Sequence, residues 1–138
     1  MANAWYEHGL TAFAEGDVQW KSGGDTFKVI LIDTADYSKD LANDEYLSSI
    51  PGPARVAIAT MTVSPVVAGV LDASDVTFTA VSGDECEALV IYQHTGTEST
   101  SRLLLYIDSG TAGLPVTPTG GADINITWSN GSEKIAKL

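Results

Sequence analysis

Acidic side chains are concentrated in one segment of this 138-residue chain, between residues 33 and 45. Hard cations such as Ca²⁺ bind several carboxylate oxygens together with backbone carbonyls, so this segment is a candidate cation site. The EF-hand pattern is interrupted here by Tyr37, Ser38 and Lys39. We favour the other interpretation, a solvated acidic surface that keeps the protein in solution, and keep the cation site as the alternative. The candidate ligands are Asp33, Asp36, Asp40 and Asp44.

A second acidic group surrounds the only cysteine, Cys86, because Asp84, Glu85 and Glu87 lie beside it in the sequence. Neighbouring negative charge disfavours the thiolate, so it raises the pKa of the thiol and lowers its reactivity. We therefore interpret Cys86 as a structural thiol at the start of a strand. A single cysteine also excludes an intrachain disulfide.

Residues that could form other reactive sites are few. His8 and His94 are the only histidines, and neither has zinc-ligand spacing to the other or to Cys86. The GxSxG nucleophile motif is absent. The glycine pair Gly120-Gly121 is not followed by the Lys-Ser/Thr of a phosphate-binding loop. We therefore expect no cofactor and no enzymatic activity.

Three tryptophans, Trp5, Trp20 and Trp128, could form a flat platform for a sugar ring. Each lies in a helical or alternating pattern of apolar residues, which is more typical of a core or an interface. We therefore favour the core or interface role and keep a carbohydrate-binding surface as an alternative.

The charge balance excludes two classes of partner. The chain has 18 Asp and Glu residues against 7 Lys and Arg, and its net charge is −11. Nucleic-acid binding requires clustered basic residues, and an anionic membrane surface repels an acidic protein. The longest apolar stretches are far shorter than the roughly 20 residues that span a bilayer. We also expect no signal peptide, because residues 1–14 lack a basic start.

The first part of the chain is predicted to be helical and then extended. Residues 1–15 carry apolar side chains at roughly helical spacing, with Asn3 as the expected N-cap and Gly16 as the expected stop. Residues 17–21 then alternate between polar and apolar types, and residues 27–33 are rich in β-branched residues. These two segments predict a hairpin.

Residues 34–53 are predicted to form a long acidic loop with a short helix near residues 44–49. Loops of this length in small domains are often functional or form an interaction surface. Pro51-Gly52-Pro53 ends the segment sharply.

The remaining two-thirds of the chain predicts strands separated by turns. Asn130-Gly131 is the residue pair that favours a type I′ hairpin turn. The pattern predicts one domain over residues 1–138, mainly β, as an antiparallel β-sandwich or barrel of about eight strands with a short N-terminal helix. The predicted later strands are residues 55–63, 65–71, 76–81, 88–93, 102–108, 124–128 and 133–138.

Aromatic and apolar side chains near the N-terminus and in the long loop are candidates for contact with other proteins. Ordered terminal segments need a surface to dock on, which favours packing between subunits. The candidates for subunit packing are Trp5, Tyr6 and Phe13, and those for contact with another protein are Tyr37, Leu41, Tyr46 and Leu47.

Several segments of the chain resemble small acidic structural proteins encoded by tailed bacteriophages. The resemblance covers most of the chain and rests on packing and turn residues rather than on a site. Cys86 departs from the pattern, which has a small polar residue there. The segments are FKVILIDTADY at 27–37, IPGPARV at 50–56, ASDVTFTAVSGD at 73–84, EALVIYQHTG at 87–96, SRLLLYID at 101–108, GLPVTPTGG at 113–121 and DINITWSNGSEKIAKL at 123–138.

The resemblance implies a virion component, made in the cytoplasm of the bacterial host. The favoured role is a capsid decoration, or cement, protein on the capsid surface. Such proteins bind the major capsid protein and commonly form homotrimers at three-fold positions. The alternatives are a tail or neck component, such as an adaptor or a small fibre or spike subunit, and a carbohydrate- or receptor-binding β-sandwich module.

Overall fold

A computed structural model describes residues 4–108, 114–129, 131 and 134–137, and in these residues the chain is mainly β with antiparallel strands, as the sequence predicts. The largest sheet has five strands in the order β1-β7-β6-β2-β3. Because β2 pairs with both β3 and β6, it has no free edge. The strands are β1 Ala4–Trp5, β2 Thr26–Ile32, β3 Arg55–Thr60, β6 Ala88–His94 and β7 Leu103–Ile107.

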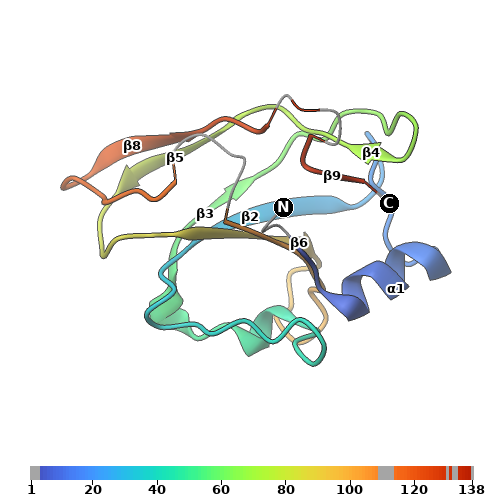
Figure 1. Ribbon diagram of the computed structural model, residues 1–138, viewed down its shortest axis with the longest axis horizontal. Helices are drawn as coiled ribbons and strands as arrows, with labels where there is room; N and C mark the ends of the chain where they lie inside the picture. The colour runs from blue at the N-terminus through green and yellow to red at the C-terminus, as the bar shows by residue number, and fades with distance from the viewer. Residues whose placement is uncertain (1–3, 109–113, 130, 132–133, 138) are drawn as a thin grey trace.

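Two smaller sheets, each with two strands, cover one face of the five-stranded sheet (Figure 1). One pairs β5 (Val76–Val81) with β8 (Ala122–Ile126), and the other pairs β4 (Val70–Leu71) with β9 (Ala136–Lys137). Residues 33–54 run across the opposite face (Figure 1). The five-stranded sheet is therefore covered on both sides.

This double cover explains the apolar character of the central strands. Along β2, Val29 and Leu31 belong to the core under the smaller sheets, whereas Ile30 and Ile32 belong to a second core under residues 33–54. Every residue of β7 is buried, and so is all of β6 except His94. Strands that are buried on both faces have continuous apolar runs instead of alternation.

The helix α1 spans Glu7–Glu15, so the predicted start at residue 1 is wrong. Its N-cap is Tyr6, because Ala4 and Trp5 are extended and pair with β7. Asn3, the expected cap, lies outside the described residues. The predicted stop is confirmed: Gly16 has a φ of 83°, and its N–H donates to the carbonyls of Ala12 and Phe13. A residue with a side chain would be strained in that left-handed conformation.

Residues 17–21 are not a strand, so the predicted hairpin with β2 is wrong. Val18 and Trp20 are buried, as the alternation predicts, but both edges of β2 are already occupied. The segment is held instead by Asp25, whose Oδ2 accepts the N–H of Gln19 at 2.7 Å. Apolar alternation thus predicts which face of a segment is buried, but it does not predict which strand the segment pairs with.

Several other predicted boundaries also change. The predicted strand at 65–71 is reduced to β4; Pro65, at the start of the predicted strand, has no N–H to donate to a ladder and lies outside β4. The short helix expected at 44–49 is a 3₁₀ turn over Leu47–Ser49, followed by a second one over Gly52–Ala54. The last strand is β9, and the expected Asn130-Gly131 turn falls partly outside the described residues.

Candidate functional site

Three carboxylates lie together at the end of β2. Asp33, Asp36 and Asp84 each place an oxygen within 4.8 Å of the other two. Asp33 is buried, and its Oδ1 accepts the N–H of Ala35 at 2.9 Å. Asp84 comes from the turn between β5 and β6, which topology brings beside the end of β2. The group offers hard oxygen ligands, but fewer than the six to eight that Ca²⁺ takes.

The other two expected ligands, Asp40 and Asp44, are not part of this group. The carboxylate of Asp40 accepts hydrogen bonds from the backbone N–H and the side-chain amide of Asn43, and these bonds lower the pKa of Asp40. Oδ2 of Asp44 accepts the Tyr37 hydroxyl at 2.7 Å and the N–H of Asp40 at 3.0 Å. Of the four candidate ligands, Asp33 and Asp36 therefore lie together, whereas Asp40 and Asp44 hold the loop in shape.

A chain of hydrogen bonds runs from the second core to Asp44. The Tyr37 hydroxyl donates to Asp44, so the Tyr6 hydroxyl, 2.8 Å away, must donate to Tyr37. Both tyrosines are buried. Burial is the main reason that the pKa of each tyrosine rises well above its ordinary value of 10.0. The folded protein therefore holds both hydroxyls in the neutral form.

We expect the free energy of unfolding to fall as the pH rises above about 10. Below this pH both tyrosines are neutral in either state, so they do not affect the pH dependence. Above it the unfolded chain releases protons that the folded chain retains, which costs about 1.4 kcal/mol per pH unit for each tyrosine. Urea unfolding between pH 9 and 11 should therefore show a shallower fall for a Tyr6→Phe/Tyr37→Phe double variant.

Tyr46→Phe is the matched control for this experiment, because the Tyr46 hydroxyl takes no part in the Tyr6–Tyr37–Asp44 chain. The control should keep the wild-type slope against pH. An unchanged slope in the double variant would contradict the assignment of the two buried hydroxyls.

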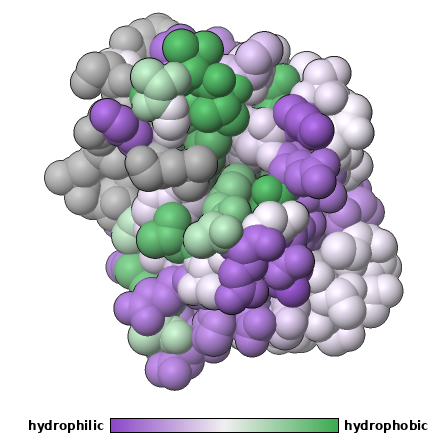
Figure 2. Space-filling model, turned by 90° about the vertical axis from the view of Figure 1, so that its right-hand side faces the viewer, coloured by the Kyte–Doolittle hydropathy of each residue, from purple (hydrophilic) through white to green (hydrophobic). Residues whose placement is uncertain are grey.

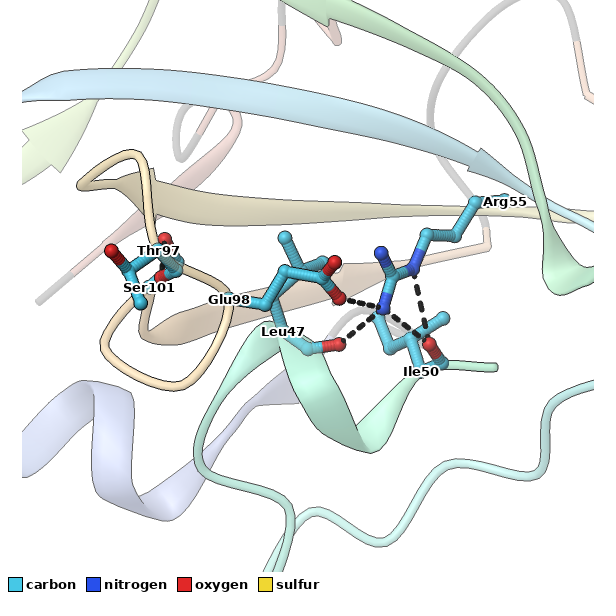
Figure 3. A network of polar contacts seen from close by, with 6 residues as sticks. All are labelled: Leu47, Ile50, Arg55, Thr97, Glu98 and Ser101. Carbon is cyan, nitrogen blue, oxygen red and sulfur yellow. Dashed lines mark hydrogen bonds and ion pairs between the residues drawn. The ribbon is translucent and has the colours of Figure 1, made fainter. Parts of the chain in front are cut away.

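Arg55 holds residues 33–54, the covering loop, on the sheet (Figure 3). Its Nη2 donates to the carbonyl oxygens of Leu47 at 2.9 Å and Ile50 at 2.6 Å, and its Nε donates to Ile50 at 3.0 Å. The same Nη2 lies 2.7 Å from Oε1 of Glu98, and this contact lowers the pKa of Glu98. Ser101 steadies the turn that carries Glu98 by donating to the Thr97 carbonyl at 2.8 Å. One guanidinium therefore joins β3, the covering loop and the β6–β7 turn.

The candidate contact residues fall into two groups. Tyr6, Tyr37 and Leu47 are buried in the second core, so the structure places them inside the subunit and leaves them almost no surface for a partner. The long loop covers the sheet, and its buried side chains Tyr37, Leu47 and Ile50 belong to the second core. The partly buried candidates are Trp5 and Phe13, whose rings meet edge to face at 5.4 Å, and Leu41 and Tyr46.

The largest exposed apolar side chains were missed by sequence reasoning. Among the described residues these are Leu10, Ile58, Val66 and Val67. The last three lie in the longest uncharged run of the chain, residues 56–71. An uncharged run in a chain with a net charge of −11 was the signal that could have identified them.

Two tryptophans are core residues, as the pattern favours. Trp20 and Trp128 are buried, and their indole N–H groups donate to the carbonyls of Asp72 at 3.1 Å and Ser74 at 3.0 Å. Buried indoles with a satisfied N–H are typical of packed interiors. They are therefore not available as a sugar platform.

The histidines are separate from these features. His8 lies 4.0 Å from Glu45 at the surface, and His94 contacts the Tyr92 ring edge to face at 6.2 Å. Within the described residues, the group of Asp33, Asp36 and Asp84 includes no histidine or cysteine.

Cys86 is a free, fully buried thiol that pairs through its backbone with Val116. Burial, followed by the nearby charges of Asp33 and Glu87, raises its pKa to about 12. The sequence predicts this direction, although it names the acidic neighbours and not burial as the cause.

Ellman's reagent should therefore not label Cys86 in the folded protein at pH 8. A pKa of about 12 in place of 9.0 leaves about a thousand-fold less thiolate, and the side chain is also inaccessible. The same protein in denaturing urea should be labelled completely within minutes. Labelling at similar rates in both states would show that the thiol is exposed.

No helix among the described residues is both long enough and apolar enough to cross a membrane. A scan against protein-family models gives no match for the chain, and a search of curated proteins finds no similar sequence.

Proposed function

We propose that the chain is a non-enzymatic structural protein of a tailed-bacteriophage virion, and that it decorates the capsid by binding the shell of major capsid protein. The observation that carries this proposal is the resemblance that extends from residue 27 to residue 138. The mechanism is mechanical. Each copy bridges neighbouring shell proteins and adds contact energy that opposes the outward pressure of packaged DNA.

The construction of the subunit supports such a role. The central sheet is covered on both faces, and Arg55 joins the covering loop to two other elements. A subunit that is already rigid loses little conformational entropy when it binds, so more of the contact energy is retained as affinity. The net charge of −11 disfavours non-specific aggregation in the host cytoplasm before assembly.

We further propose that the decorating unit is a homotrimer. The exposed parts of Leu41 and Tyr46, on the covering loop, are candidates for contact with the shell. The buried members of the same loop, Tyr37 and Leu47, support that surface from below.

Copy number in purified virions tests the proposal. Quantitative mass spectrometry should give a ratio to the major capsid protein that is one or a simple fraction. A few copies per particle would overturn capsid decoration and favour the neck or tail. Absence from washed particles would overturn the virion assignment altogether.

A further inference from the structure

A β-hairpin at residues 62–74 projects from the end of the molecule that carries β4 and α1. Its base is held from several sides. The N–H groups of Ser64 and Ser74 donate to the carbonyls of Asp72 and Thr62, both at 2.9 Å. The two buried tryptophan indoles donate to the carbonyls of Asp72 and Ser74. The base of the hairpin is therefore part of the rigid body.

The tip of this hairpin is apolar and exposed. Val70 donates its N–H to the carbonyl of Val67 at 2.9 Å, which closes a tight turn. The two central residues, Ala68 and Gly69, have φ values of 52° and 76°, as a type I′ turn requires. Alanine is uncommon at such an angle, so the turn is held despite a local cost. Val67 is 71% exposed and Val66 is 39% exposed.

An open depression of about 440 Å³ lies directly beside the tip. Its wall includes Pro65, Val67 and Val70 from the hairpin itself, and the ion pair of Lys134 with Asp72, 3.0 Å apart, at its edge. Figure 2 looks onto this end of the molecule and shows apolar side chains gathered from its upper edge to its centre, with hydrophilic side chains below them. The exposed apolar tip and the depression therefore lie next to each other.

The charge pattern indicates what covers this surface. A basic partner is attracted to acidic surface, whereas residues 56–71 carry no charge at all. A second copy of this chain also has a net charge of −11, so two copies repel wherever their acidic surfaces meet. Their electrostatic repulsion is smallest when they meet through an uncharged patch. The ion pair of Lys134 with Asp72 at the edge of this patch has no net charge.

We propose that the 65–70 tip is the self-association surface of this protein. The tip of each copy rests in the depression of a neighbouring copy, around a rotation axis that passes beside the hairpin. Because the tip and the depression are adjacent on one subunit, every tip in a closed ring of copies can occupy the depression of a neighbour. The inference rests on the proposed function only for the number of copies, three, in one assembly.

Analytical ultracentrifugation of the full chain tests this without any virus particle. The wild-type mass should rise with concentration from 14.5 kDa towards a small multiple of that value. Val67→Glu should weaken association about a hundred-fold, because it buries a charge in an apolar contact. The matched control is Ile58→Glu, which changes another exposed apolar side chain of the same uncharged run, outside the hairpin.

Salt gives a second readout. Association between two acidic copies should strengthen between 50 and 500 mM NaCl, since salt screens their repulsion.

A monomer at all concentrations would overturn the proposal, and so would an oligomer that Val67→Glu leaves intact. If the chain is monomeric and Val67→Glu instead weakens binding to virions, the tip contacts the shell. In that case self-association fails while capsid decoration stands.

Discussion

Replacing Gly9 with alanine should lower the free energy of unfolding by about 2 kcal/mol, although alanine is the better helix former by about 1 kcal/mol. Gly9 lies in the first half of α1 and is buried against β7. A Cβ atom built at this position would collide with the carbonyl oxygen of Leu103 and lie 2.8 Å from Cα of Leu104. Both are backbone atoms of a fully buried strand, so neither can rotate away.

The helix must therefore move outward, and that movement has further consequences. Ala12 and Phe13 on the same helix pack into the first core and would lose contacts. The hydrogen bond from the N–H of Tyr6 to the carbonyl of Leu104, 2.9 Å long, would lengthen. These losses exceed the gain in helix propensity, so we expect a lower midpoint of thermal unfolding, by roughly 5–10 °C.

Thr11→Ala is the control, because Thr11 lies on the exposed side of the same helix. It should leave the midpoint unchanged or raise it slightly. A Gly9→Ala variant as stable as the control would mean that α1 does not pack closely on β7. Thermal unfolding followed by circular dichroism measures both variants.

The sequence predicts best the elements whose pattern depends on local chemistry alone. β5 is found at residues 76–81 as predicted, since its alternation matches a strand with one buried face. The helix stop at Gly16 follows from the left-handed conformation that glycine adopts readily. The start of the same helix is not predictable in this way, because Trp5 pairs with Leu105, a residue far along the chain.

The covering role of residues 33–54 could have been inferred from the strands and not from the loop. β2 and β6 are apolar on both faces, so both faces must be buried. The segment between β2 and β3 contains spaced apolar residues such as Tyr37, Leu47 and Ile50, which can supply the second cover. Taken alone, the loop sequence favours an exposed contact surface, and the prediction that Tyr37 and Leu47 belong to one follows from that.

The group of Asp33, Asp36 and Asp84 could also be predicted only in part from the sequence. Asp33 and Asp36 are close in sequence, so their proximity is predictable. Asp84 joins them because Ile32 at the end of β2 pairs with Ala88 at the start of β6. Strand order is a tertiary property, and a single sequence gives no direct information on it.

Replacing Arg55 with methionine should lower the free energy of unfolding by about 3 kcal/mol. Methionine retains much of the apolar stem of arginine but donates no hydrogen bond. The Arg55 side chain is only 16% exposed, and its loss removes the donors to the carbonyls of Leu47 and Ile50. Hydrogen bonds from a charged donor are worth about 1.5–3 kcal/mol each, and a buried acceptor left without its donor adds a penalty.

The planar fork of the guanidinium is as important here as its charge. Nε and Nη2 reach two carbonyls and the carboxylate of Glu98 at the same time. Lysine keeps the charge but presents a single nitrogen, so Arg55→Lys should recover only part of the loss. Chemical denaturation with urea ranks the two variants against the wild type.

Glu98→Gln is the matched control, because it removes the charge of the exposed partner and keeps an acceptor oxygen near Arg55. Its midpoint of urea unfolding should stay close to that of the wild type, since exposed ion pairs contribute little. Hydrogen exchange gives a local readout as well. In Arg55→Met the N–H groups of Leu47 and Ile50, which donate to Ser101 and Leu47, should exchange faster than those of β6. If Glu98→Gln destabilises the protein as much as Arg55→Met, the ion pair and not the two carbonyl contacts holds the covering loop on the sheet.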